Sequence, residues 1–320
     1  MVVYCVKKIN VLSLFSGIGG FEKALHDLEV DYHLVNYSEI DIFASKSYSI
    51  IHNVDEKLNL GDISKIDEKQ LPKDIDLIFY GFPCTNISRA GKKNGFFNED
   101  GSKTKSGLVF DALRIINEVK PKVAMLENVM SLLGDKFKSQ FEELLYQLEL
   151  SGYNNFYNIL DSRCFKIPQK RERVFVVSIR NDITLNNFNF PQGEPLEIDL
   201  DEFLDFELEV DDKYYLTDEQ IYSINNSKFS QRRGVLQEKY YCDTLLARDY
   251  KDPKCIRVGN KIRRLTPNEY LKLMGFENIN FDKLNNAISD SQLYKQCGNS
   301  VSVPVVKAIL QSLIDCNIFN

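Results

Sequence analysis

The chain has 320 residues, 43% of them hydrophobic and 27% charged, which is enough for a large core and a smaller second domain. Lysine and arginine number 40 and aspartate and glutamate 46, so the net charge of −6 is not that of a typical nucleic-acid-binding protein. The seven cysteines form neither a C-x-x-C pair nor a Cys/His cluster with zinc spacing, so we expect no metal site and no disulfide framework. A reducing cytoplasm suits this cysteine usage best. The apolar start of the chain is interrupted by Lys7, Lys8 and Asn10, which excludes a membrane span there.

Charge is distributed unevenly along the chain. Residues 194–219 contain twelve acidic residues and one basic residue, whereas residues 228–264 contain eleven basic and four acidic residues. A smaller basic stretch, 88–105, contains five basic and two acidic residues. A polyanion would be attracted to the two basic stretches and repelled by the acidic one, although a single charged run is more often a solvated face.

Apolar runs alternate with amphipathic patterns in the first 180 residues. The expected strands are 9–14, 32–37, 76–80, 122–126 and 173–179, and the expected helices start near residue 21 and span 41–51, 107–119 and 137–150. Strands separated by helices predict an α/β fold with a parallel sheet covered on both faces. Ligands of such sheets bind at the carboxyl ends of the strands.

The pattern changes after Asn181, where the chain becomes polar and poor in long helices. We expect residues 1–180 to form the first part of the main domain and residues 181–261 to form a separate, irregular domain. Residues 262–320 are expected to return to the main domain with helices. Thr266, Pro267 and Glu269 match a capping box with proline at the first helical position, and a last helix is expected at 303–316.

A glycine-rich turn, FSGIGG at 15–20, lies between the first strand and the first helix. Glycines let a backbone approach a ligand, and a helix N-terminus presents unpaired N–H groups. Glu39 follows at the end of the second strand, where an acidic side chain can bind a ribose diol, and Asp62 could hold an adenine amino group. A nicotinamide site uses the same arrangement, and a purely structural turn fits it too.

Pro83 and Cys84 follow the strand at 76–80 and lead into a basic, glycine-bearing loop. An arbitrary cysteine is usually a small core residue, but this position at a strand end favours a nucleophile, which would need an environment that stabilises the thiolate. Glu127, at the end of the next strand, could face the same pocket or be a solvated carboxylate. Arg171 and Arg173 could hold a carboxylate or a phosphate, or be surface charges.

The only histidines, at 26, 33 and 52, lie far from these segments in the sequence. A Ser-His-Asp or Cys-His mechanism therefore has no support.

Eight segments resemble, in order and spacing, the bacterial and phage DNA cytosine-5 methyltransferases. They are LFSGIGGFEKAL, NYSEID, GDI, GFPCTNIS, ENV, IPQKRERVF, RRLTPNEYLKLMGF and YKQCGNSVSVPVV. Together they cover nearly the whole chain, which makes the resemblance specific. It implies a Rossmann-like methyltransferase domain dependent on S-adenosyl-L-methionine, with a mostly parallel sheet. It also implies a small, irregular target-recognition domain at about 181–261.

The resemblance implies S-adenosyl-L-methionine as methyl donor and S-adenosyl-L-homocysteine as product. The residues it implies around the donor are Phe15, Ser16, Gly17, Gly19, Gly20, Glu39, Ile40, Asp62, Ile63, Pro83, Leu108, Asn299 and Ser300.

For catalysis, the resemblance implies that Cys84 attacks C6 of a cytosine flipped out of double-stranded DNA. Glu127 would act on N3 and the amino group of the ring, and Arg173 would help to hold the base, supported by Arg171 and Gln169. The implied DNA-contacting residues are Ser88, Arg89, Lys92, Lys93, Arg232, Arg233, Thr244 and Arg248. We expect a monomer in the cytoplasm, encoded by a prokaryote or a phage, that acts on a short site, with a cognate restriction endonuclease as one candidate partner.

Three positions depart from the family pattern. Thr85 stands where many relatives have Gln, and Ile40 stands at a position that is often aromatic, which weakens the expected stacking on adenine. Cys297 is interpreted as a packing residue rather than a second nucleophile.

Three other functions compete with this interpretation. A tRNA cytosine-5 methyltransferase would share the fold, but the segment around Asp243-Thr244-Leu245 resembles a DNA target-recognition step. A nicotinamide-dependent oxidoreductase would leave Cys84 and Glu127 unexplained. An inactive DNA-binding homologue would not need Cys84, Glu127 and Arg173 together.

Overall fold

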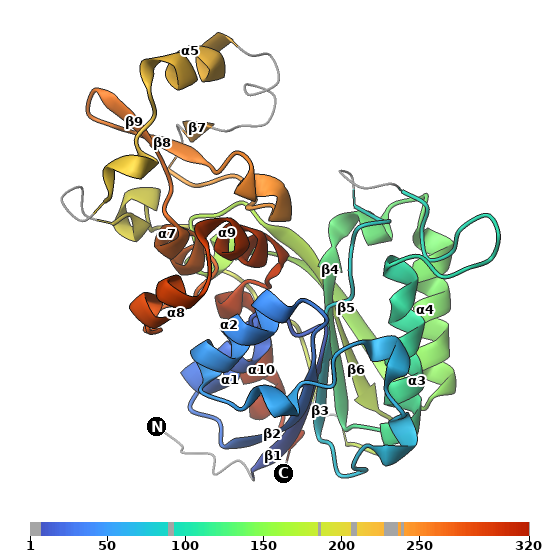
Figure 1. Cartoon of the computed structure of the whole chain (residues 1–320). Helices are drawn as coiled ribbons and strands as arrows, with labels where there is room; N and C mark the ends of the chain where they lie inside the picture. The colour runs from blue at the N-terminus through green and yellow to red at the C-terminus, as the bar shows by residue number, and fades with distance from the viewer. Residues whose placement is uncertain are drawn as a thin grey trace. The chain divides into compact units, whose positions relative to one another are not determined.

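The computed structural model describes residues 8–88, 93–184, 187–205, 210–226, 236–237 and 240–319 (Figure 1). It divides into two compact units, which are described separately. Unit 1 consists of Met1–Leu160, Glu172–Gln192 and Val306–Asn320, and unit 2 consists of Asp161–Arg171 and Gly193–Val305.

Unit 1 is built on a six-stranded sheet with the order β2-β1-β3-β4-β6-β5. The strands are β1 (Ile9–Leu14), β2 (Tyr32–Ser38), β3 (Leu77–Tyr80), β4 (Val123–Val129), β5 (Tyr153–Asp161) and β6 (Glu172–Arg180). The pairs β2–β1, β1–β3 and β3–β4 are parallel, whereas β6 is antiparallel to β4. The expected mostly parallel α/β sheet is therefore confirmed.

Strand β5 is a feature that the apolar patterns did not predict. It ends the strand order of the sheet, and its residues Asn154, Tyr157 and Asn158 are exposed. An edge strand with one solvated face carries polar residues, so it lacks the continuous apolar run that marks a central strand.

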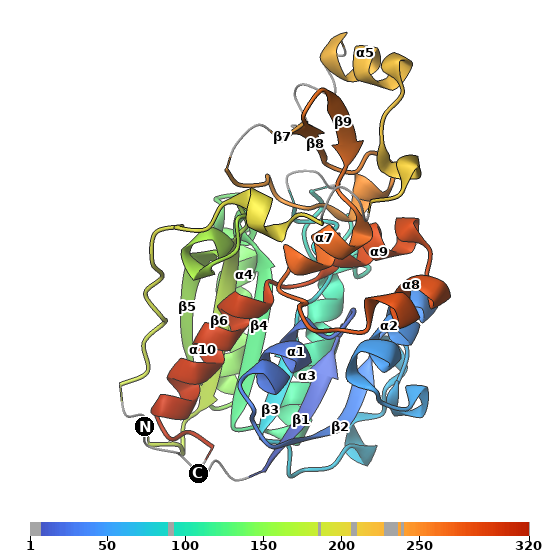
Figure 2. The ribbon, with the colours of Figure 1, turned by 90° about the vertical axis from the view of Figure 1, so that its left-hand side faces the viewer.

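Helices cover both faces of this sheet. They are α1 (Gly20–Asp27), α2 (Ile42–His52), α3 (Val109–Val119), α4 (Lys138–Leu150) and the C-terminal part of α10 (Val303–Asp315). Figure 1 and Figure 2 show α3 and α4 on one face, with α1 and α10 on the other. The side chains of Leu12, Ile78 and Leu126 are fully buried in one cluster with residues of α3 and α4. Each such side chain stabilises the fold by about 1.5–3 kcal/mol.

Residues Asp290–Asp315 have the length of a membrane span, and an 18-residue window within them reaches a mean hydropathy of 1.2. The structure instead breaks this stretch into α9 (Asp290–Asn299) and α10, and 56% of its most apolar window is buried inside the protein. These are properties of core helices rather than of a span that faces lipid.

Unit 2 contains a small three-stranded sheet with the order β7-β8-β9 and four α-helices among its described residues. The strands are β7 (Leu236–Gln237), β8 (Cys255–Val258) and β9 (Lys261–Arg264), and the helices are α5 (Asp218–Asn226), α7 (Pro267–Lys272), α8 (Phe281–Ala287) and α9.

The start of α7 confirms the capping box expected from the sequence. Thr266 Oγ1 accepts a hydrogen bond from the N–H of Glu269 at 3.1 Å, and Glu269 Oε2 accepts one from the N–H of Thr266 at 2.6 Å. The Glu269 carboxylate also forms two hydrogen bonds with Arg263, at 2.6 and 2.8 Å, in a fully buried pair. This pair links β9 to α7. Loss of either partner would leave the other charge unpaired in the interior, which would destabilise the fold.

Candidate active site

The glycine-rich turn after β1 has left-handed backbone conformations at Phe15, Gly17 and Gly19, with φ of 55°, 57° and 80°. A Cβ atom on Gly19 would lie 2.1 Å from Nε2 of His52, so only glycine fits there. A Cβ atom on Gly17 would meet nothing within 4 Å. The backbone at Gly17 therefore borders open space, where a ligand can approach it.

Glu39 follows β2 and reaches the same turn. Its Oε2 accepts a hydrogen bond from the N–H of Gly17 at 2.9 Å, and its Oε1 accepts one from the N–H of Asp41 at 2.7 Å. Burial raises the pKa of this carboxyl, and the two backbone hydrogen bonds oppose that effect. The next residue, Ile40, is 71% exposed. An acid and an exposed apolar side chain thus flank the turn.

Asp62 lies at the start of η2 (Ile63–Lys65), a short 3-10 helix. Hydrogen bonds from the hydroxyl and backbone N–H of Ser64, at 2.8 and 3.0 Å, lower the pKa of the Asp62 carboxyl. Ser38 donates to the carbonyl of Gly61 at 2.7 Å, which ties the end of β2 to this segment. The structure therefore brings Glu39 and Asp62 to one edge of the sheet.

Three other residues expected around the donor, Ile63, Leu108 and Ser16, are less exposed to solvent than Ile40. Ile63 is 3% exposed and lies in the core of unit 1, and the half-buried Leu108 packs against the same core. Ser16 is also buried.

The Pro83-Cys84 turn follows β3 and is held by side chains from three other segments. Asn128 Nδ2 donates to the carbonyl of Phe82 at 3.0 Å, and Ser106 Oγ donates to the carbonyl of Pro83 at 2.6 Å. Ser131 Oγ donates to the carbonyl of Ile87 at 2.8 Å. These contacts were not predicted from the sequence, where only the position of Asn128 beside Glu127 hinted at one of them. They fix the backbone on both sides of Cys84.

Cys84 is half-buried beside the core of unit 1. Three other cysteines, Cys242, Cys255 and Cys297, are buried, and burial raises the pKa of each thiol, to about 12 for Cys255. A thiol that is held above its ordinary pKa gives little thiolate at neutral pH. Among these four residues, Cys84 is the one suited to act as a nucleophile, and Cys297 has the burial expected of a packing residue.

Glu127 and Arg173 form an ion pair at the carboxyl end of β4. Arg173 Nε lies 3.1 Å from Glu127 Oε1, and the two side chains are 14% and 10% exposed. In the antiparallel pairing of β4 with β6, Arg173 stands opposite Val129. The start of β6 therefore lies at the edge of the sheet where β3 and β4 end. The strand ends thus bring the Cys84 turn, Glu127 and Arg173 to one edge of unit 1.

The model of the C-5 cytosine-specific DNA methylase family matches residues 9–315. This chain belongs to that family. It is 38% identical over 270 residues to the type II methyltransferase M2.ScrFI of Lactococcus lactis subsp. cremoris, a match that covers 80% of this chain and 71% of the relative. It is 36% identical to the type II methyltransferase M.SsoII of Shigella sonnei, covering 96% and 80% of the two chains.

The solved structure of the Entamoeba histolytica methyltransferase EhMeth has the same fold, with a TM-score of 0.77 and 22% identity over 97% of this chain and 98% of that one. The protein is therefore an enzyme, a DNA cytosine-5 methyltransferase, and the family expected from the sequence is confirmed.

In the methylase, Arg171 and Gln169 belong to unit 2 and bind backbone atoms within that unit. The Arg171 guanidinium is buried and donates to the carbonyls of Leu245, Gly298 and Ser300. Gln169 donates to the carbonyl of Leu273 at 2.8 Å and accepts from the N–H of Leu245 at 3.1 Å. These contacts suit residues that position the backbone next to Thr244.

The end of α9 carries the last two residues expected around the donor. Asn299 is exposed and Ser300 is buried, and both belong to unit 2. Gly298 packs tightly there, because a Cβ atom on it would lie 2.1 Å from the backbone N of Ala247. Glycine at this position permits the close approach of α9 and η10 (Ala247–Tyr250).

The residues expected to contact DNA are described only in part. Arg89, Lys92, Arg232 and Arg233 lie outside the described residues. Of the others, Lys93 and Arg248 are exposed, and Ser88 and Thr244 are half-buried. In the basic stretch 228–264 the side chains of Lys254 and Arg263 are buried, so these two cations are not presented to DNA.

Proposed function

We propose that this methylase uses S-adenosyl-L-methionine and methylates a cytosine flipped out of duplex DNA through a covalent bond between Cys84 and C6. The proposal rests mainly on the position of the half-buried Cys84 at the sheet edge that carries the Glu127–Arg173 pair. In a stacked duplex C6 is out of reach of a side chain, so the base has to leave the helix.

The residues around the glycine turn fit an adenosine-containing donor. The open space at Gly17 admits a ligand to the backbone, and the Glu39 carboxylate is placed to accept hydrogen bonds from ribose hydroxyls. Asp62 would accept from the adenine amino group, and the exposed Ile40 offers an apolar contact to the ring. For Asn299 and Ser300, which belong to unit 2, a role in donor binding is proposed from the family resemblance alone. When bound, the donor supplies an electrophilic methyl group.

The protein's own residues account for the activation of cytosine. The Cys84 thiolate adds to C6, and the electrons of the C5–C6 double bond move into the ring, where Glu127 hydrogen-bonds to or protonates N3. C5 then has the electron density of an enamine and accepts the methyl group. Loss of the C5 proton to a base re-forms the double bond, expels the Cys84 thiolate and leaves 5-methylcytosine. Arg173 holds the Glu127 carboxylate in place for this sequence.

We also propose that the segment 88–105 closes on DNA and that residues 181–261 form the target-recognition domain, with residues 262–320 returning to the catalytic domain. Two of the relatives are named type II methyltransferases. A restriction-modification role in the cytoplasm with a cognate endonuclease is proposed on that basis. That the enzyme acts as a monomer is a separate proposal. Bisulfite sequencing of DNA from cells that express the protein would identify the target site.

Trapping with 5-fluorocytosine tests the covalent step. Fluorine at C5 cannot leave as a proton, so duplex DNA carrying 5-fluorocytosine in the methylated site should form an adduct with wild-type protein that survives denaturing electrophoresis. Cys84→Ser should form none, and Cys164→Ser, which changes an exposed cysteine, should react like the wild type. Absence of a wild-type adduct on a proven substrate sequence would contradict addition by Cys84. A preference for tRNA over duplex DNA in the methylation assay would contradict the proposed substrate.

A further inference from the structure

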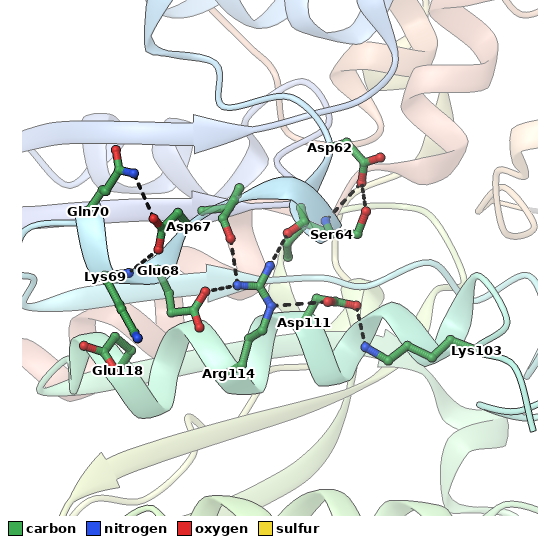
Figure 3. A network of polar contacts seen from close by, with 12 residues as sticks. Asp62, Ser64, Asp67, Glu68, Lys69, Gln70, Lys103, Asp111, Arg114 and Glu118 are labelled. Atoms are coloured by element: carbon green, nitrogen blue, oxygen red, sulfur yellow. Dashed lines mark hydrogen bonds and ion pairs between the residues drawn. The ribbon is translucent and has the colours of Figure 1, made fainter.

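Arg114 of α3 contacts the segment that carries Asp62 (Figure 3). Its Nη2 donates to the carbonyl of Ile63 at 2.7 Å, and its Nη1 donates to the carbonyl of Ile66 at 2.7 Å. Nη1 also pairs with the carboxylate of Glu68. One guanidinium thus binds the backbone at both ends of η2, the turn that begins directly after Asp62.

The orientation of Arg114 is set from its own helix. Asp111 Oδ1 lies 3.3 Å from Arg114 Nε, and Asp111 Oδ2 binds Nζ of Lys103 at 3.1 Å. Asp111 is 5% exposed, so its charge has to be satisfied by these two cations. Figure 3 shows the chain of contacts from Glu68 through Arg114 to Asp111 and Lys103. The guanidinium is therefore held in one direction before any ligand binds.

The two carbonyls require the shape of arginine. A guanidinium presents several donors in a rigid plane, whereas the single ammonium group of lysine sits at the end of a flexible chain. Lysine could keep the attraction to Glu68 and Asp111, but it could not donate to Ile63 and Ile66 in the same geometry. Substitution of Arg114 by lysine therefore preserves the charge and removes the two hydrogen bonds to the backbone of η2 and Ile66.

We propose that Arg114 is a positioning residue for the adenosine end of the methyl donor: it holds η2 so that the Asp62 carboxylate is presented to the adenine amino group. This inference rests on the proposed role of Asp62 in donor binding. Because Arg114 acts through the backbone and does not touch the donor, its loss weakens donor binding and leaves the chemistry at Cys84 unchanged.

The test compares Arg114→Lys, Asp62→Ala and the double variant. Calorimetry gives the Kd for S-adenosyl-L-homocysteine, and steady-state kinetics give KM for S-adenosyl-L-methionine and kcat. Arg114→Lys should raise Kd and KM about tenfold, the size expected for loss of hydrogen bonds from a charged group, with kcat within about twofold of wild type. The double variant should be little weaker than Asp62→Ala, because both changes disable the same contact. Hydrogen exchange of the donor-free protein should show faster exchange at Lys65 and Ile66, whose amides close the η2 turn.

Glu118→Gln is the matched control, because Glu118 is on the same helix and pairs with Lys73 without contacting η2. It should leave Kd, KM and hydrogen exchange at η2 unchanged. If wild-type protein binds neither form of the donor, the proposed cofactor itself is wrong. If wild type binds but Arg114→Lys binds equally well, or if the two changes are additive, the positioning role of Arg114 is wrong. A fall in kcat with unchanged KM would likewise overturn it, because that result indicates only a smaller folded fraction.

Discussion

Arg173 Nε lies 3.1 Å from Oε1 of Glu127, and the two residues come from antiparallel neighbouring strands. The pair lies where β4 ends and β6 begins, so its geometry depends on the direction in which β6 enters the sheet. Because both side chains are largely shielded from water, each charge depends on the other more strongly than in a surface pair.

Removal of Arg173 is therefore expected to affect both stability and activity. Arg173→Ala leaves the Glu127 carboxylate without this counter-ion and should lower the free energy of unfolding by about 3 kcal/mol, with loss of measurable methyl transfer. Arg173→Lys keeps the charge and should retain most of the stability while kcat still falls, because an ammonium lacks the planar geometry of guanidinium. Urea denaturation and single-turnover methylation measure the two effects. Equal activity of Arg173→Lys and wild type would show that only the charge matters.

Cys84→Ser should abolish turnover without loss of the donor site. The hydroxyl of serine is far less acidic than a thiol, so the nucleophile is lost, while the glycine turn and Glu39 are unchanged. We expect kcat to fall at least about a thousandfold and the Kd for S-adenosyl-L-homocysteine to stay within about twofold of wild type. Turnover of the Cys84→Ser protein at the wild-type rate would rule out this residue as nucleophile.

The glycine turn allows a comparison between backbone strain and lack of space. Gly19 and Gly101 both have φ of 80°, but a Cβ atom on Gly19 would lie 2.1 Å from His52, whereas one on Gly101 would meet nothing within 4 Å. Alanine at either position has the same strain, about 1–2 kcal/mol. Gly19→Ala should therefore be less stable than Gly101→Ala by a further 1–3 kcal/mol or so, and it should also bind the donor more weakly. Thermal unfolding with and without S-adenosyl-L-homocysteine measures both effects, and equal stability of the two variants would contradict the crowding at Gly19.

Glu22 of α1 should make the stability of the protein dependent on pH. Burial raises the pKa of this fully buried carboxyl to about 7 from its ordinary value of 4.5. Between these two values the unfolded chain ionises at Glu22 while the folded protein keeps its proton. The contribution of Glu22 to the free energy of unfolding is therefore fully present below about pH 4.5 and is lost as the pH rises through about 7. The loss is on the order of 3 kcal/mol.

Replacement of Glu22 by glutamine should remove that contribution. We expect Glu22→Gln to be more stable than wild type at pH 8 and the difference to shrink at pH 5, as measured by urea denaturation at both values. A difference that is independent of pH would show that Glu22 does not titrate in this range.

Local sequence patterns were sufficient for much of the fold. The apolar run at 9–14 is β1, Thr266 and Glu269 cap α7 as expected, and the final helix starts at Val303. The glycine turn, Cys84 and Glu127 could also be placed at strand ends, because periodicity and turn residues report on neighbours within a few positions along the chain.

Other features depend on contacts between residues far apart in the sequence. A pattern of apolar residues is the same for a strand of either direction, so it could not show that β6 is antiparallel and that Arg173 thereby reaches Glu127. Nor could it show that Arg171 donates hydrogen bonds to backbone carbonyls more than 70 residues away, or that Arg114 donates to the carbonyls of the turn after Asp62. The sequence by itself pointed to the residues that we propose carry the chemistry and to the elements on which they lie. Only the tertiary structure decided which of them meet, because strand direction and buried hydrogen bonds are set by pairing across the whole fold.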